Sequence, residues 1–236
     1  VVINDQIVKK PNRNVGIVYQ HYSLYDFLTA EENIAFGLML DETTLLERAL
    51  MPWSWWPKKR KHLKEAKEWL DNLGLGHAIG SYPHELSGGM RQRVAIGQAL
   101  IMKPAVILLD EPFGALDETT REELQKMLLS LYQENLKAIE QGEKPPYTVF
   151  MVTHELDEAF YIADRIIGLS KYWHSVETNA SGNNLGATIC YDKKCPVYHP
   201  EDIRNFNLFR EQKKELKEVV FSRKFVDPRK YRTFWS

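Results

Sequence analysis

Three short apolar segments of the chain each end in a polar residue. They are VGIVYQ, which ends at Gln20, VILLDE, which ends at Asp110 and Glu111, and TVFMVTH, which ends at His154. Continuous Val, Ile and Leu runs of this length, separated by helical patterns, are typical of buried parallel strands in an α/β sheet. Ligands bind at the carboxyl ends of such strands, so the pattern predicts one shared site for these polar residues.

Two helices are predicted from apolar residues that recur on one helical face. The first covers residues 62–73 and is expected to end at Gly74. The second covers residues 155–163 and carries acids in its first turn, where the helix dipole favours anions. Their apolar faces hold Leu63, Ala66, Leu70 and Leu73, and Leu156, Ala159, Phe160 and Ala163. Loops are predicted at 51–61, 140–147 and 179–186.

Beyond residue 170 the pattern predicts a strand over GATICY and a helix that opens at Pro200. This helix places five apolar residues roughly on one side. They are Ile203, Phe206, Phe209, Leu216 and Val220. We expect residues 171–236 to form an appendage to the main domain rather than an independent module.

Composition limits the classes of protein. A chain of 236 residues with 44% apolar content is long enough for one well-buried domain. A formal charge of −1 argues against nucleic acid as a partner. No run of about 18 apolar residues occurs, so we expect any membrane role to involve a partner. Cys190 and Cys195 lack metal-ligand spacing and are expected to be free thiols in a reducing compartment.

The segment LSGGMRQRV, residues 86–94, is predicted to begin a helix that faces an anion. Ser87 suits the N-cap, and Gly88 and Gly89 leave the first backbone N–H groups uncovered. A phosphate is the usual guest of such a helix start. Taken alone, the segment fits a capped helix after a flexible loop equally well.

Asp110 and Glu111 close an apolar strand, and side chains alternate along a strand, so the two carboxylates suit different tasks. Asp110 can hold Mg²⁺ through its water shell, and Glu111 can orient or deprotonate an attacking water. The alternative is an acid pair at a strand end that caps the next helix.

Five segments occur in an order that resembles the ABC-type ATPases. YQ at 19–20, LSGGMRQR at 86–93, VILLDEP at 106–112, FGALD at 113–117 and TH at 153–154 look like the Q-loop, signature, Walker B, D-loop and switch histidine of that family. The sequence around these motifs is most similar to that of the ATP-binding subunits of nitrate, sulfonate and taurine importers. The resemblance implies an α/β, P-loop NTPase-like nucleotide-binding domain with a mainly parallel sheet over 1–170 and a helical subdomain near 30–100.

The resemblance also implies roles for residues that match the family's motifs. Ser87, Gly88 and Gly89 would contact the γ-phosphate of ATP held by the other subunit of a head-to-tail dimer, and Gln92 would join this nucleotide site. Glu111 would be the general base, and Asp110 would support Mg²⁺. Gln20 would contact the metal or the attacking water, and His154 would hold the γ-phosphate. Asp117 would take part in the contact between the subunits.

The implied function is ATP hydrolysis that powers import of a small anion or a small nitrogen or sulfur compound. The implied partners are a second ATP-binding subunit, transmembrane permease subunits and, indirectly, a solute-binding protein. The chain would lie peripherally on the cytoplasmic face of the membrane. Two alternatives are a non-transport ABC ATPase that acts on DNA or ribosomes and a regulatory partner that binds no nucleotide.

The sequence departs from the family in one motif, because it contains no G-x-x-x-x-G-K-S/T phosphate loop. In the family that loop precedes the segment resembling VVINDQIV, so it would lie before Val1. We expect truncation of the N-terminal part rather than loss of the motif.

Residues 49–61, ALMPWSWWPKKRK, are a second unusual segment. Trp53, Trp55 and Trp56 lie between Pro52 and Pro57, and four basic residues follow. Tryptophan beside Lys and Arg is typical of a membrane interface or a partner's groove. A packed surface loop of the helical subdomain is the other interpretation.

Overall fold

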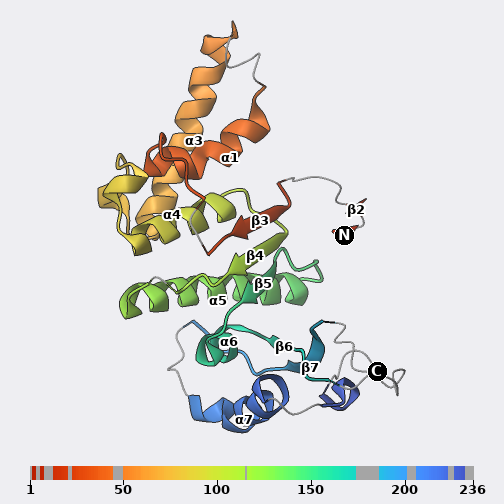
Figure 1. Cartoon of the computed structure of the whole chain (residues 1–236). Helices are drawn as coiled ribbons and strands as arrows, with labels where there is room; N and C mark the ends of the chain where they lie inside the picture. The colour runs from red at the N-terminus through yellow and green to blue at the C-terminus, as the bar shows by residue number, and fades with distance from the viewer. Residues whose placement is uncertain are drawn as a thin grey trace. The chain divides into compact units, whose positions relative to one another are not determined.

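The computed structural model describes residues 2–3, 6–7, 13–20, 23–44, 50–114, 116–173, 186–200, 206–222 and 226–231. Their contacts divide the chain into two compact units, Val1–Thr153 and His154–Ser236, named unit 1 and unit 2 below. The elements of both units are labelled in Figure 1.

Unit 1 contains a parallel sheet of strands β3 (Val15–Val18), β4 (Val106–Asp110) and β5 (Thr148–Val152), in that order. The structure confirms the three predicted parallel strands. Their predicted burial is wrong for β5, in which no residue is buried and in which Phe150 and Val152 are 54% and 63% exposed. Val18 pairs with Leu109, which itself pairs with Met151, so the carboxyl ends of all three strands lie at one edge of the sheet. Strands β1 (Val2–Ile3) and β2 (Gln6–Ile7) form a separate antiparallel pair.

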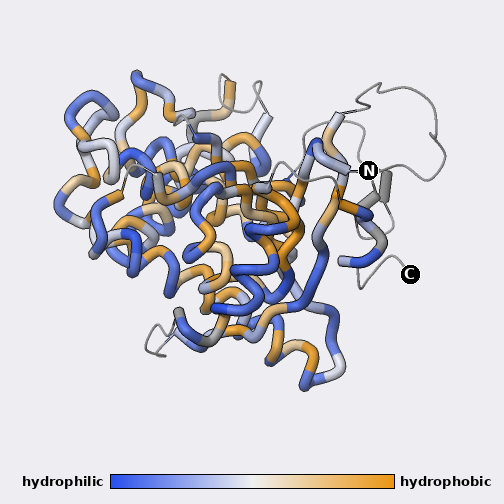
Figure 2. Tube along the Cα trace, turned by 60° about the horizontal axis from the view of Figure 1, so that its bottom comes forward, coloured by the Kyte–Doolittle hydropathy of each residue, from blue (hydrophilic) through white to orange (hydrophobic). Residues whose placement is uncertain are grey.

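The helices of unit 1 are α1 (Ala30–Glu42), α3 (Pro52–Asn72), α4 (Gly88–Leu100) and α5 (Glu118–Glu140), with the short 3₁₀ turns η1 (Gly76–Ala78) and η2 (Pro83–Glu85). A capping box starts α1, because the Thr29 side chain accepts from the Glu32 backbone N–H while the Glu32 carboxylate accepts from the Thr29 backbone N–H. Figure 2 shows hydrophobic and hydrophilic residues following one another along the coiled stretches of the trace, as expected for helices with one buried side. Helices α1, α3 and α4 pack together and fall within the predicted helical subdomain.

The prediction of a loop over 51–61 is wrong, because α3 already begins at Pro52. Proline is well tolerated at the first helical position, where its missing N–H would have no intrahelical partner. Pro57 lies one turn further on and removes the donor to the Trp53 carbonyl, near the exposed start of the helix where water can replace it. The predicted end is confirmed: Leu73 is the C-cap, and Gly74 has a φ of 68°.

Strand β3 and helix α4 approach each other closely at Gly16. A Cβ atom at this position would lie 2.9 Å from the carbonyl oxygen of Ala99 and 3.0 Å from Cγ of Pro104. The Ala99 oxygen belongs to the backbone of α4 and cannot rotate away. Glycine at 16 therefore sets how closely the helix carrying the LSGG segment packs on the sheet.

Gly16→Ala is expected to lower the free energy of unfolding by about 1–3 kcal/mol, because helix and strand must separate to admit the methyl group. Gly80→Ala is the matched control, since a Cβ at Gly80 meets nothing within 4 Å. Its expected effect is within about 0.5 kcal/mol. Urea denaturation of both variants tests the prediction, and equal stabilities would contradict the close approach.

Unit 2 contains α6 (Leu156–Ile162) and an antiparallel pair of strands, β6 (Arg165–Ser170) and β7 (Thr188–Lys194). The predicted helix over 155–163 and the predicted strand at GATICY are confirmed, although the strand starts at Thr188. The predicted loop over 140–147 is confirmed except for its first residue, because α5 ends at Glu140 and β5 begins at Thr148. Most of the predicted loop over 179–186 lies outside the described residues.

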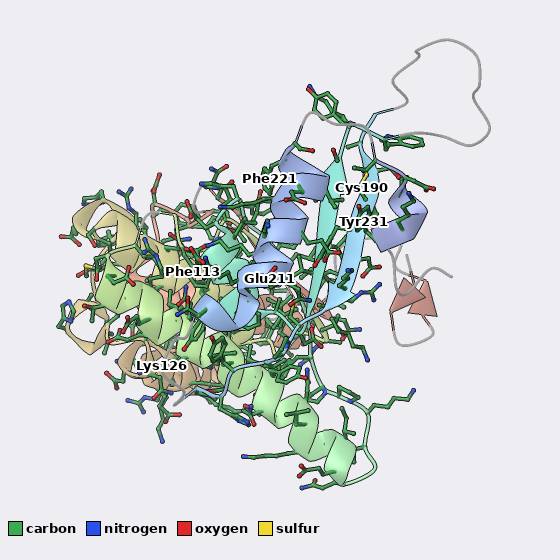
Figure 3. The ribbon with its side chains drawn as sticks, turned by 90° about the horizontal axis from the view of Figure 1, so that it is seen from below. Phe113, Lys126, Cys190, Glu211, Phe221 and Tyr231 are labelled. Carbon is green, nitrogen blue, oxygen red and sulfur yellow. The ribbon has the colours of Figure 1, made fainter. Side chains whose placement is uncertain are left out.

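The predicted C-terminal helix is present but irregular. It consists of the 3₁₀ turn η3 (Phe206–Phe209), α7 (Arg210–Leu216) and the π-helical η4 (Lys217–Phe221), and a last 3₁₀ turn, η5, covers Pro228–Tyr231. Figure 3 shows Glu211 near the start and Phe221 at the end of α7–η4, which runs along strands β6 and β7. Val219 is more deeply buried than the predicted Val220, since the wider π turn shifts the inward face. Ile203 lies outside the described residues.

The two cysteines are buried and free, as predicted. Burial, with a smaller contribution from the nearby Asp164 carboxylate, raises the pKa of the Cys195 thiol to about 12. The thiol therefore stays protonated and unreactive in the folded chain.

Residues 154–170 make most of their contacts within unit 2 and so belong with the C-terminal part of the chain. A boundary of the ABC domain at residue 170 stays a prediction.

Candidate functional site

Gln20 and Glu111 come together at the carboxyl edge of the parallel sheet. Gln20 lies two residues beyond β3, and Glu111 directly follows β4. The Gln20 side-chain amide donates from Nε2 to Oε2 of Glu111 over 3.0 Å, although 91 positions separate the two residues. The sheet register therefore brings together two of the side chains for which the sequence predicts a shared site.

The backbone of Glu111 is strained and held from two sides. Its φ is 47°, in the left-handed region that costs a residue with a Cβ about 1–2 kcal/mol. Its N–H donates to the Val152 carbonyl at the end of β5 over 2.9 Å. Strain that the surroundings maintain in this way is common at functional sites, because it fixes the direction of a side chain.

Gln92 of α4 provides the second support. Its side chain is 1% exposed, and its Nε2 donates to the Pro112 carbonyl and, over 3.5 Å, to the Glu111 carbonyl. A contact with nucleotide would require this buried amide to leave its backbone partners, so the predicted nucleotide contact of Gln92 finds no support in this geometry. Our sequence reasoning missed the positioning contact. Its signal is a polar side chain on the otherwise apolar inner face of α4.

Helix α4 begins as predicted. It starts at Gly88, and the N-cap Ser87 accepts a hydrogen bond from the Met90 N–H over 3.2 Å. Ser87 is exposed, while Gly88 and Gly89 are half-buried. Arg93 connects α4 to the end of α3, because its guanidinium donates a hydrogen bond to the Leu73 carbonyl over 3.0 Å. The N-terminus of a helix that is held in place in this way faces solvent and favours an anion.

Asp117 is the N-cap of α5. Its carboxylate accepts from the Thr120 N–H over 3.0 Å and from the Thr120 hydroxyl over 2.8 Å. These hydrogen bonds lower the pKa of Asp117, so the side chain is ionised at neutral pH. The structure thus shows a capping role, and the predicted contact between subunits stays a prediction.

Asp110 and His154 are both exposed. Asp110 is the last residue of β4, and His154 opens unit 2, where its Nε2 lies 3.5 Å from a Glu155 carboxylate oxygen. A role for His154 beside Glu111 stays a prediction. No group of three or more His, Cys, Asp or Glu arranged for a metal ion occurs among the described residues. The oxygen atoms of Gln20 and Asp110 are the type that Mg²⁺ prefers when phosphates supply other ligands.

A parallel α/β sheet with polar side chains at its carboxyl edge, together with a capped helix whose N-terminus is exposed, defines a class of phosphate-binding α/β proteins. Comparisons with known proteins narrow this class. Residues 2–114 match the family described as ABC transporter.

Curated relatives agree with this match. The aliphatic sulfonates import ATP-binding protein SsuB of Bacillus thuringiensis subsp. konkukian is 39% identical over 171 residues, which are 72% of this chain and 57% of the relative. The bicarbonate transport ATP-binding protein CmpC of Synechocystis is 37% identical, over 93% of this chain and 30% of the relative. The sulfate/thiosulfate import ATP-binding protein CysA of Vibrio cholerae is 40% identical, over 67% of this chain and 37% of the relative.

A solved structure shows the same fold. It is a dimeric ATP-binding cassette in a post-hydrolysis state bound to ADP and Pi, with 29% identity and a TM-score of 0.54, over 70% of this chain and 66% of that one. Residues 2–114 therefore match the ABC transporter family, and the chain shares the fold of this ATP-binding cassette. It spans a little over half the length of the sulfonate import proteins that it matches.

Proposed function

We propose that this chain is part of the ATP-hydrolysing subunit of an ABC importer. The observation that carries the proposal is the hydrogen bond between Gln20 and Glu111 at the carboxyl edge of the sheet. This bond supports the proposal, because a carboxylate that is held in one direction can orient a water that attacks a phosphate. The importer names of the curated relatives support the same reading.

Glu111 acts in this proposal as the general base, and Gln20 holds its carboxylate until the nucleotide is in place. Asp110 and Gln20 would hold Mg²⁺, which would supply positive charge to stabilise the negative charge that develops on the phosphates. Gln92 acts as a positioning residue, since its contacts fix the backbone at Glu111 and Pro112. His154 would hold the γ-phosphate.

The exposed start of α4 acts on a second subunit. Ser87, Gly88 and Gly89 would bind the γ-phosphate of an ATP held mainly by the partner in a head-to-tail dimer. The dimeric state of the solved cassette with ADP and Pi supports this arrangement. The Asp117 carboxylate would contribute to the contact between the subunits.

The transported solute in this proposal is a small anion. The curated relatives are named for import of aliphatic sulfonates, bicarbonate, and sulfate or thiosulfate. Transmembrane permease subunits would be the direct partners, and a solute-binding protein would act through them. The chain would then work at the cytoplasmic face of the membrane.

The test is ATP hydrolysis by the complete subunit assembled with its permease in vesicles. We expect Mg-ATP turnover that rises when one of these anions is supplied with the solute-binding protein. Absence of hydrolysis would contradict the ATPase assignment. Hydrolysis that ignores the permease and every anion would contradict the importer assignment alone.

A further inference from the structure

The N-terminal half of α3 presents an exposed, positively charged face that the proposed ATP site does not use. Residues 53–64 contain Lys and Arg but neither Asp nor Glu. Acids are also missing from the first turn of the helix. The cations of this segment are Lys58, Lys59, Arg60, Lys61 and Lys64.

The exposed face forms a stripe along the helix. Trp53, Trp56, Arg60 and Lys64 recur at intervals of three or four residues, so they lie on one side. The opposite side, which includes Ala66 and Leu70, is buried where α3 packs against α1. The stripe is therefore unavailable for the core of unit 1, and its composition needs another explanation.

Aromatic side chains occupy the outer end of the stripe. Trp53 is 71% exposed and Trp56 is 67% exposed, which is unusual for so large an apolar side chain. Leu50 and Met51, just before the helix, are exposed as well. Figure 1 shows this end of α3 at the part of unit 1 farthest from β4 and α5.

Cations follow the tryptophans and line an open groove with Trp56, Pro57 and Leu63. Lys59 is paired with Glu32, and Lys67 with Glu31, each over 3.3 Å. In the described part of the chain no acidic side chain forms an ion pair with Arg60, Lys61 or Lys64. These three side chains are exposed, so their charges are accessible to a partner.

We propose that this end of α3 binds the surface of an anionic lipid bilayer. At about 1.5 Å per residue, Arg60 lies about 6 Å and Lys64 about 12 Å behind Trp56 along the helix axis. A helix that enters the headgroup layer by its end would place its tryptophans at the interface and its cations at the lipid phosphates. Its role is surface contact, since no helix among the described residues is long and apolar enough to cross a bilayer.

An acidic segment of a partner protein would also attract the cations. It would leave the two tryptophans ahead of them unexplained, whereas a lipid interface binds both kinds of side chain. The lipid surface is therefore the occupant that the whole stripe fits. The proposal does not depend on ATP binding.

The test uses the chain without nucleotide and two kinds of vesicle, phosphatidylcholine alone and phosphatidylcholine mixed with phosphatidylglycerol. We expect sedimentation with the anionic vesicles only and a blue shift of tryptophan emission. The triple variant Arg60→Gln/Lys61→Gln/Lys64→Gln should lower the partition coefficient by roughly 10- to 100-fold. Trp53→Ser/Trp56→Ser should lower it and remove the blue shift.

The matched control removes three charges elsewhere on unit 1, from the exposed Lys126, Lys137 and Lys144. It should bind the anionic vesicles as the parent chain does, and all variants should keep the parent's far-UV circular dichroism. Equal binding by the two triple variants would overturn the proposal. So would binding to polyglutamate with no binding to either vesicle, which would favour an acidic protein partner.

Discussion

Glu111→Gln is expected to lower the steady-state ATPase rate of the assembled subunit by about 10²- to 10⁴-fold while ATP binding is retained. A general base contributes a factor of this size, equivalent to roughly 3–5 kcal/mol of barrier. Glutamine keeps the size of the side chain and can still pair with the Gln20 amide, but it cannot take a proton from water. The variant should therefore accumulate as an ATP-bound dimer, visible by light scattering.

Asp110→Asn should behave differently from Glu111→Gln. It removes negative charge next to the proposed Mg²⁺ site, so the Mg²⁺ concentration needed for half-maximal activity should rise. Glu123→Gln, which removes an exposed charge on α5, is the control. It should leave the ATPase rate and the Mg²⁺ concentration for half-maximal activity unchanged. Near-normal turnover in Glu111→Gln would remove this residue from the catalytic role. Failure of Glu111→Gln to bind ATP would mean that the two carboxylates have exchanged roles.

The sheet and its edge could be predicted from sequence because parallel strands are typically continuous apolar runs, although no residue of β5 is buried here. The runs ending at Gln20 and Glu111 also fix the side of the sheet on which polar residues gather. The hydrogen bond between these residues was beyond prediction. It depends on the register of β3 against β4 and on the left-handed φ of Glu111, and neither follows from residue type.

At the start of α3 the local composition predicted the wrong element, a loop in place of a helix. Two prolines and three tryptophans within six residues suggested a loop. Pro52 instead occupies the first helical position, and Pro57 lies close enough to the helix start that one lost hydrogen bond is tolerated. Contacts with α1 stabilise the rest of the helix, as in the ion pair between Lys59 and Glu32. Tertiary packing of this kind cannot be seen in a local composition.

Gln92 illustrates why site residues are harder to assign than elements. Its place in the LSGGMRQR segment implied a nucleotide contact through the resemblance to the family. The helical turn carries Gln92 to the buried face of α4 instead, where it meets the carbonyls of Glu111 and Pro112. A motif fixes the residues of a segment, and the helix period decides which of them face the ligand.

Arg165→Met is expected to lower the stability of the β6–β7 pair by about 3–5 kcal/mol. Arg165 donates from Nε and Nη2 to the two carboxylate oxygens of Asp192, each over 2.7 Å. Asp192 is fully buried, whereas the Arg165 side chain is 36% exposed. Loss of the guanidinium leaves a buried carboxylate without its main cationic partner, and the cost of burying that charge is no longer offset.

Substitution of Arg165 and substitution of Asp192 should therefore lower the stability by different amounts. Asp192→Asn leaves a guanidinium that water can reach, so the expected loss is only about 1–2 kcal/mol. The double variant Arg165→Met/Asp192→Leu should recover most of the stability, because a buried ion pair contributes little over apolar packing. Arg13→Met, which breaks the exposed pair with Asp41, is the control, with an expected loss of about 0–1 kcal/mol. Hydrogen exchange of the β6 and β7 amides measures these effects, and a larger loss in Asp192→Asn than in Arg165→Met would contradict the proposed asymmetry.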